Sequence, residues 1–148
     1  MFRPKNILVP TDFSEYSDKA LLQALDIAKQ YKARVYLYHV VNDYVQQCAG
    51  DYCIDYAVVE KLQAEMRAKG KEKILKEIEK LPEAKGVEVI ADVGHGKPYE
   101  AIMNEAKDKN VDLIVLASLG KSGVAHVIIG SVARHILREA KCSVLLTK

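Results

Sequence analysis

The 148-residue sequence contains no long hydrophobic run and no strong excess of one charge. No apolar stretch approaches the roughly 20 residues that cross a bilayer as a helix, so we predict no membrane-spanning segment. The formal net charge is only +2, and basic residues are interspersed with acidic ones, which argues against nucleic acid as a partner. The chain begins with a predicted strand and shows no signal peptide, so we expect a cytoplasmic protein.

Cysteine is also scarce, and the chain has only Cys48, Cys53 and Cys142. An odd number of cysteines without a secretory signal is a poor disulfide framework. Cys48 and Cys53 are close in sequence, which is also compatible with a redox pair or half of a metal site. Zinc sites need about four ligands at a recognisable spacing, however, and the sequence offers no second pair. We therefore favour free thiols.

Short apolar segments alternate with amphipathic segments along the whole chain. Strands are predicted at residues 5–10, 34–41, 86–93, 111–117 and 143–147, and helices at residues 17–31, 57–81, 99–109 and 131–139. This alternation predicts a single α/β domain, residues 1–148, with an open five-stranded parallel sheet and helices on both faces. The last strand lies at an edge, which favours a homodimer through residues Val144 to Thr147.

Helical periodicity predicts which faces are buried. The helix at 57–81 is expected to bury Val58, Leu62, Met66, Ile74, Leu75, Ile78 and Leu81. Gly70, in the middle of this helix, weakens it by roughly 1 kcal/mol relative to alanine. The helix at 131–139 is expected to bury Val132, Ala133, Ile136 and Leu137. His39 lies inside an apolar strand, where a hydrogen-bonded core histidine is more common than a catalyst.

The stretch 111–131 carries the strongest functional signal in the sequence. A buried strand ends in small residues, Gly120 follows, and Gly130 and Ser131 precede a helical pattern. A strand, a glycine loop and a helix N-terminus together can hold phosphate, because bare amides approach the anion and the helix end adds positive charge. The alternative is that Gly130 and Ser131 form a plain helix N-cap.

Asp12 comes just after the first strand, at the edge of the sheet where ligands bind in open α/β folds. It could bind a ligand or only cap its own turn, and position alone leaves both interpretations open, as it does for Thr11. The segment 42–55 follows the second strand on the same side and has no clear periodicity. It is either a lid or partner-binding loop, or a surface loop without a task.

Six short motifs lie at residues 7–14, 37–41, 94–98, 112–116, 130–133 and 142–146. In this order and spacing they resemble the universal stress protein (UspA) family. The resemblance covers essentially the whole chain. It implies an adenine nucleotide alpha hydrolase-like sheet of order 3-2-1-4-5 and a dimer through the last strand. Members that bind ATP share Gly-x2-Gly-x9-Gly-Ser/Thr. Here Gly120 and Gly130-Ser131 match this motif, whereas Ala117 replaces the first glycine. Alanine keeps its backbone N–H, and only a positive φ at this position would be unfavourable for it.

The resemblance also implies roles for particular residues. Asp12 would hold ribose or a metal ion, the backbone around Val40 would meet adenine, and amides of residues 117–122 and 130–132 would hold the phosphates. The candidate binding residues are Pro10, Thr11, Asp12, Val40, Ala117, Ser118, Leu119, Gly120, Lys121, Ser122, Gly130, Ser131 and Val132. Mg²⁺ or Mn²⁺ would arrive with the nucleotide.

These observations together predict a homodimeric ATP-binding sensor or switch. We expect at most slow ATP hydrolysis, because the sequence shows no general base placed for a water and no full Walker motif. The alternative is a dimeric stress-response module that binds no nucleotide and recruits protein partners through its dimer surface and the 42–55 loop. Ala117 is the feature that favours this alternative.

Overall fold

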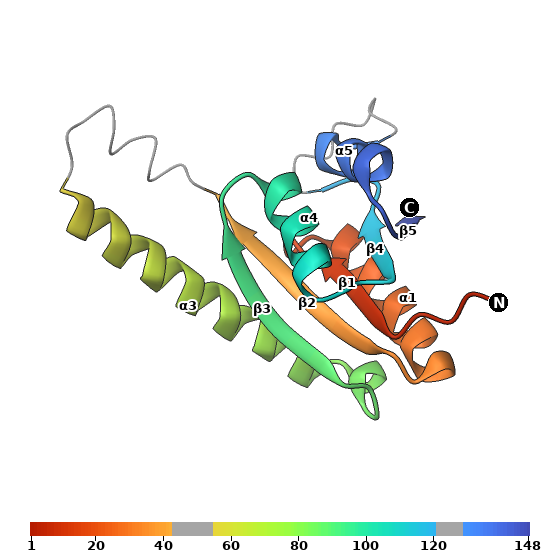
Figure 1. The fold of residues 1–148 in the computed structure, drawn as a ribbon. Coiled ribbons are helices and arrows are strands. Elements are labelled where there is room, and N and C mark those ends of the chain that lie inside the picture. The colour runs from red at the N-terminus through yellow and green to blue at the C-terminus, as the bar shows by residue number, and fades with distance from the viewer. Residues whose placement is uncertain (43–54, 121–128) are drawn as a thin grey trace.

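The computed structural model describes residues 1–42, 55–120 and 129–148 and contains a five-stranded parallel sheet of order β3-β2-β1-β4-β5 (Figure 1). Its strands are β1 (Asn6–Pro10), β2 (Arg34–Val41), β3 (Val89–His95), β4 (Leu113–Ala117) and β5 (Ser143–Thr147). All four neighbouring pairs of strands are parallel. The predicted fold class and strand order are confirmed.

Helices cover both faces of the sheet. They are α1 (Glu15–Tyr31), α3 (Tyr56–Lys80), α4 (Pro98–Asp108) and α5 (Ser131–Glu139), with a short 3₁₀ turn, η1 (Pro82–Ala84). The helices α1 and α3 pack on one face, and α4 and α5 pack on the other. No helix in the described part of the chain is long and apolar enough to cross a membrane.

The central strand β1 explains why apolar residues follow one another in this chain without polar interruption. Ile7 and Val9 point into the core beneath α1, and Leu8 points into the core beneath α4 and α5. All three side chains are fully buried. A strand covered on both faces has no solvent side, so it carries a continuous apolar run rather than an alternating one.

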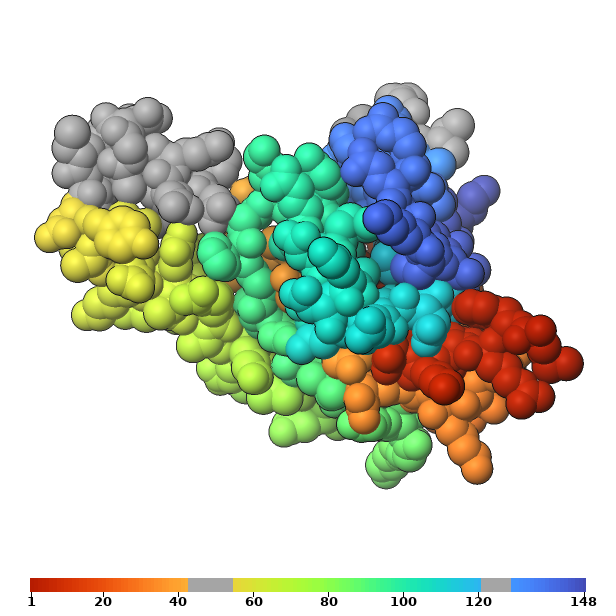
Figure 2. All heavy atoms as spheres, viewed as in Figure 1, coloured from red at the N-terminus to blue at the C-terminus, as the bar shows by residue number. Residues whose placement is uncertain are grey.

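The predicted buried stripe of α3 is wrong for much of the helix. Val58, Leu62, Met66 and Leu75 are 40–48% exposed, whereas Val59, Gly70 and Ile74 are the buried residues. Ile74, Ile78 and Leu81 do lie in or pack on the core, as predicted. The first turns of α3 project beyond the sheet in the ribbon (Figure 1) and protrude from the molecule in the space-filling view (yellow in Figure 2). Periodicity there marks a face that the described residues leave uncovered.

Gly70 has a packing role that its low helix propensity did not reveal. A Cβ atom added to Gly70 would lie 3.3 Å from His39 Cδ2 and 3.6 Å from both methyl groups of Val93. The missing side chain therefore lets α3 approach β2 and β3 closely.

Two further predictions are corrected. Leu137 of α5 is 42% exposed and Val132 is only partly buried, because this short helix turns a narrow stripe, Ala133 and Ile136, onto the sheet. Strand β3 begins three residues later than predicted, at Val89, and extends beyond its predicted end at residue 93 through a glycine to His95. That glycine, Gly94, has no room for a side chain because the Tyr38 ring of β2 lies against it.

Candidate functional site

The carboxyl ends of β1 and β4 mark the point at which the strand order reverses. From β1 the chain proceeds outward to β2 and β3, and it then adds β4 and β5 on the other side of β1. Open α/β sheets bind ligands in the crevice outside such a point. Asp12 follows β1 and Gly120 follows β4, so both halves of the predicted site lie at this edge (Figure 1).

The Asp12 carboxylate and the backbone of Gly120 are in close contact. A Cβ atom added to Gly120 would lie 2.6 Å from Asp12 Oδ2, so a side chain at this position would displace the carboxylate. The described part of the loop after β4 therefore faces Asp12. Because a carboxylate repels phosphate, Asp12 suits a hydroxyl group or a cation as its ligand.

Local hydrogen bonds hold the turn that presents Asp12. Asp12 Oδ1 accepts the Ser14 N–H at 3.0 Å, and Thr11 Oγ1 accepts the Phe13 N–H at 3.0 Å. Phe13 has a φ of 61°, in the left-handed region that bulky residues seldom adopt. The capping interpretation of Asp12 is therefore confirmed for one carboxylate oxygen, while the other oxygen faces Gly120.

Thr11 is buried, and its polar groups are engaged within the protein. Its N–H donates to the Tyr38 carbonyl at 2.8 Å, and its hydroxyl lies 3.1 Å from the Ser17 hydroxyl. Its carbonyl accepts a hydrogen bond from His39 Nδ1 at 2.8 Å. His39 is thus the hydrogen-bonded histidine that the sequence predicted, and Thr11 holds the turn that starts where Pro10 ends β1.

Ala117, the residue that departs from the family motif, ends β4 without backbone strain. The residues other than glycine with positive φ in the described chain are Phe13, Lys32 and Asn110, and Ala117 is not among them. The concern about alanine at this position therefore does not apply to its backbone conformation. Leu119 continues the described loop between Ser118 and Gly120, and it is partly exposed.

Ser118 joins the loop to both neighbouring elements. Its N–H donates to the Thr147 carbonyl of β5 at 2.8 Å, and its carbonyl accepts the Gly130 N–H at 2.7 Å. The residue is 5% exposed. The start of α5 is therefore tied directly to the end of β4, which brings the two phosphate-binding segments expected from the sequence to one place.

The first main-chain N–H groups of α5 have no acceptor within the helix. Gly130 is the N-cap, and no side chain caps the helix there. The first helical hydrogen bond runs from the Arg134 N–H to the Gly130 carbonyl, so the N–H groups of Ser131, Val132 and Ala133 have no acceptor within the helix. Ala133 adds a donor that the sequence-based hypothesis did not name, whereas the Gly130 N–H is already bonded to Ser118.

Some predicted features lie outside the described residues. Lys121 and Ser122 belong to the segment 121–128, and Cys48 and Cys53 belong to the segment 43–54, as does most of the 42–55 loop. In the part of the chain that the structure does describe, no group of three or more histidine, cysteine or acidic side chains could hold a metal ion.

Comparisons with known proteins agree with this architecture. The family model described as "Universal stress protein family" matches residues 4–148. The universal stress protein MJ0531 of Methanocaldococcus jannaschii is 33% identical over 144 residues, which cover 97% of this chain and 82% of that protein.

Solved structures share the fold over its full length. UspA from Lactobacillus plantarum has a TM-score of 0.81 at 25% identity, and the match covers 100% of both chains. A universal stress protein solved in complex with cAMP has a TM-score of 0.70 at 22% identity, and the match covers 99% of both chains. Since the family model spans nearly the whole sequence and its strand order is the one observed, the chain belongs to the universal stress protein family.

Proposed function

We propose that this protein is a homodimeric ATP-binding sensor or switch. The observation that carries the proposal is the contact between Gly120 and the Asp12 carboxylate, beside the uncapped start of α5. Bare main chain, a helix N-terminus and one carboxylate then surround the crevice where open α/β sheets bind ligands. That another universal stress protein of this fold was solved with cAMP is consistent with an adenine nucleotide as the ligand.

The charges at the start of α1 favour a metal ion that arrives with the nucleotide. Burial, and then the neighbouring Glu15 and Asp12, raise the pKa of Asp18, while Lys73 acts in the opposite direction. A Mg²⁺ or Mn²⁺ ion at Asp12 would relieve this repulsion and would complete its coordination with phosphate oxygens and waters. Asp12 is then a ligand to the metal or to ribose.

We expect at most slow hydrolysis of the bound ATP. A general base must lie within hydrogen-bond reach of the attacking water. Asp12 is the carboxylate at the described part of the site, and its Oδ1 atom already accepts the Ser14 N–H. Binding without rapid turnover suits a sensor better than a motor or a transferase.

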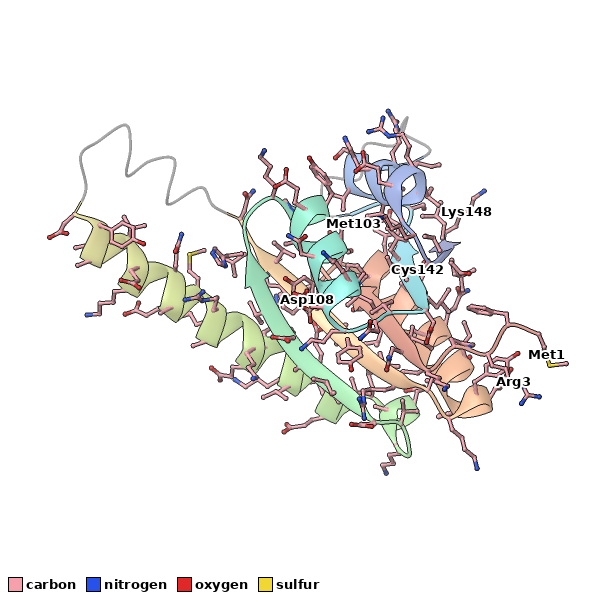
Figure 3. All side chains as sticks on the ribbon, viewed as in Figure 1. Met1, Arg3, Met103, Asp108, Cys142 and Lys148 are labelled. Atoms are coloured by element: carbon pink, nitrogen blue, oxygen red, sulfur yellow. The ribbon has the colours of Figure 1, made fainter. Side chains whose placement is uncertain are left out.

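Dimerisation is the second part of the proposal. Strand β5 pairs with β4 on one side and lies at the edge of the sheet on the other. Figure 3 shows this edge between the labelled Cys142 and Lys148, which flank the strand. Three apolar side chains in the middle of β5 are only partly buried in the single chain: Val144, Leu145 and Leu146. A second copy would pair the edge and cover these side chains.

The direct test is to purify the protein without added nucleotide, denature it and look for released ATP by chromatography. Addition of ATP and Mg²⁺ should also raise the melting temperature, because a ligand that binds only the native state stabilises it. Asp12→Ala and Gly120→Val should abolish this rise. Asp26→Ala removes an exposed carboxylate from α1 and is the matched control, which should retain it.

Two results would overturn the ATP proposal: a wild-type protein that neither carries nor responds to ATP, or a full response in both Asp12→Ala and Gly120→Val. The first result in a protein that still dimerises would favour the partner-recruiting module instead.

A further inference from the structure

The hydrogen-bond ladder between β1 and β2 ends in an unusual way. Up to this point the two strands exchange regular parallel hydrogen bonds, and the last of them runs from the Thr11 N–H to the Tyr38 carbonyl at 2.8 Å. In a parallel ladder the next bond would run from the Val40 N–H to the Thr11 carbonyl. The hydrogen bond that the structure has at this carbonyl comes instead from the His39 side chain, with Nδ1 at 2.8 Å.

This exchange leaves the Val40 N–H facing the candidate site. Main-chain groups alternate in direction along a strand, and Val35 and Val41 bond toward the β3 side of β2. Val40 therefore directs its N–H toward β1, where the chain has already turned away at Asp12. Within the described part of the chain this N–H has no hydrogen-bond partner.

The imidazole is held in place from two directions. The Phe13 ring packs on it, with 4.5 Å between ring centroids. On the side of α3, a Cβ atom added to Gly70 would lie 3.3 Å from His39 Cδ2, and Lys73 of the same helix lies with Nζ 4.0 Å from the centre of the Phe13 ring. His39 is thus enclosed between the turn that presents Asp12 and the helix α3.

We infer that His39 is a positioning residue for the proposed nucleotide site. Its ring takes the place of a main-chain donor, which fixes the Thr11–Asp12 peptide and leaves the Val40 N–H for an acceptor atom on the ligand. The inference rests on the proposed function for its ligand but makes a separate claim about the ligand-free protein.

The test compares three variants in the full-length protein. His39→Leu removes the donor, His39→Asn keeps a side-chain amide N–H near the position of Nδ1, and Val93→Ala loosens the packing beneath Gly70 without touching Thr11. By calorimetric titration with ATP and Mg²⁺, His39→Leu should bind about tenfold more weakly, the loss expected for one hydrogen bond and the geometry that it fixes. His39→Asn should recover most of this affinity, and Val93→Ala should keep the wild-type value.

A second measurement needs no nucleotide. Amide hydrogen exchange of Phe13 and Ser14 reports on the turn directly, because these N–H groups bond to Thr11 and Asp12. His39→Leu should speed their exchange relative to Val93→Ala. Unchanged exchange would overturn the inference, and so would faster exchange with an unchanged affinity for ATP. If the wild type binds no ATP, the proposed function fails on its own, while the exchange data still decide whether His39 holds the turn.

Discussion

At the scale of single residues, several residues at the candidate site hold a neighbouring group in position. Thr11 uses its N–H, hydroxyl and carbonyl within the protein, and Asp12 gives one oxygen to Ser14. Gly120 has no side chain, and this leaves space for the Asp12 carboxylate. Candidate binding residues of this kind are recognised by what surrounds them rather than by their chemical type.

A second residue-scale feature is the carboxyl group of Glu105 in α4, on the face of the sheet opposite α1 and α3. Its side chain is 13% exposed, with Lys109 Nζ at 3.8 Å. Burial, and then the charge of Asp92, raise the pKa of Glu105 above its ordinary value, although Lys109 acts against this. The folded protein therefore holds this proton more tightly than the unfolded chain does, so stability falls as the pH rises from the ordinary glutamate range through the raised pKa.

Glu105→Gln removes this pH-dependent cost and nearly keeps the shape of the side chain. We expect the variant to be more stable than the wild type at neutral pH, and the gain to vanish in acid, below the ordinary pKa of glutamate. Urea unfolding at several pH values measures the difference. If Glu105→Gln is instead less stable than the wild type at neutral pH, and this loss disappears in acid, the contact with Lys109 outweighs the cost of burial.

At the scale of elements, the helix α3 shows how position along a helix decides what its pattern means. Its first turns carry exposed apolar residues, and its later turns approach the sheet through Gly70 and Ile74. Glycine in a helix interior normally lowers stability, so an alanine or valine would ordinarily be tolerated. Here the space is taken by His39 and Val93.

Gly70→Val should therefore destabilise the protein by about 1–3 kcal/mol, because added methyl groups overpack a close contact. Ala68→Val is the matched control, since residue 68 is exposed on the same helix and should lose only the small propensity term. Chemical denaturation of the two variants gives the comparison. Equal losses would mean that α3 can move away from the sheet at little cost.

At the scale of the whole molecule, the sheet has an open edge at β5. The Ser143 N–H donates to the Asp112 main-chain carbonyl, and the Thr147 carbonyl accepts the Ser118 N–H. The main-chain groups of alternate residues of β5 therefore face β4. By the same alternation the main-chain groups of Val144 and Leu146 face outward. The proposed dimer would bond through these outward groups.

Val144→Pro removes one outward N–H and leaves the ladder to β4 intact, whereas Leu145→Pro removes an inward one. In the dimer proposal Val144→Pro should give a folded monomer by light scattering on a size-exclusion column. Leu145→Pro should instead lower the stability of the chain itself. A wild-type monomer at concentrations of about 100 μM, or a Val144→Pro variant that remains dimeric, would contradict pairing through this edge.

Much of the fold could be predicted because its signals are local. Continuous apolar runs mark strands buried on both faces, as the fully buried side chains of β1 show. The bounds of β2 and β5 were predicted residue for residue. The exposed face of α3 and the true extent of β3 could not be predicted, because both depend on neighbours distant in sequence.

By itself the sequence determined the alternation of strands and helices, the family, and the positions of the glycines in the loop between β4 and α5. Each of these is encoded in a short stretch of the chain. Only the tertiary structure decided which residues meet: that Gly120 lies against Asp12, that Ser118 ties β4 to α5, and that His39 bonds to Thr11. Such contacts join residues that are many positions apart, and their geometry comes from the packing of the whole sheet.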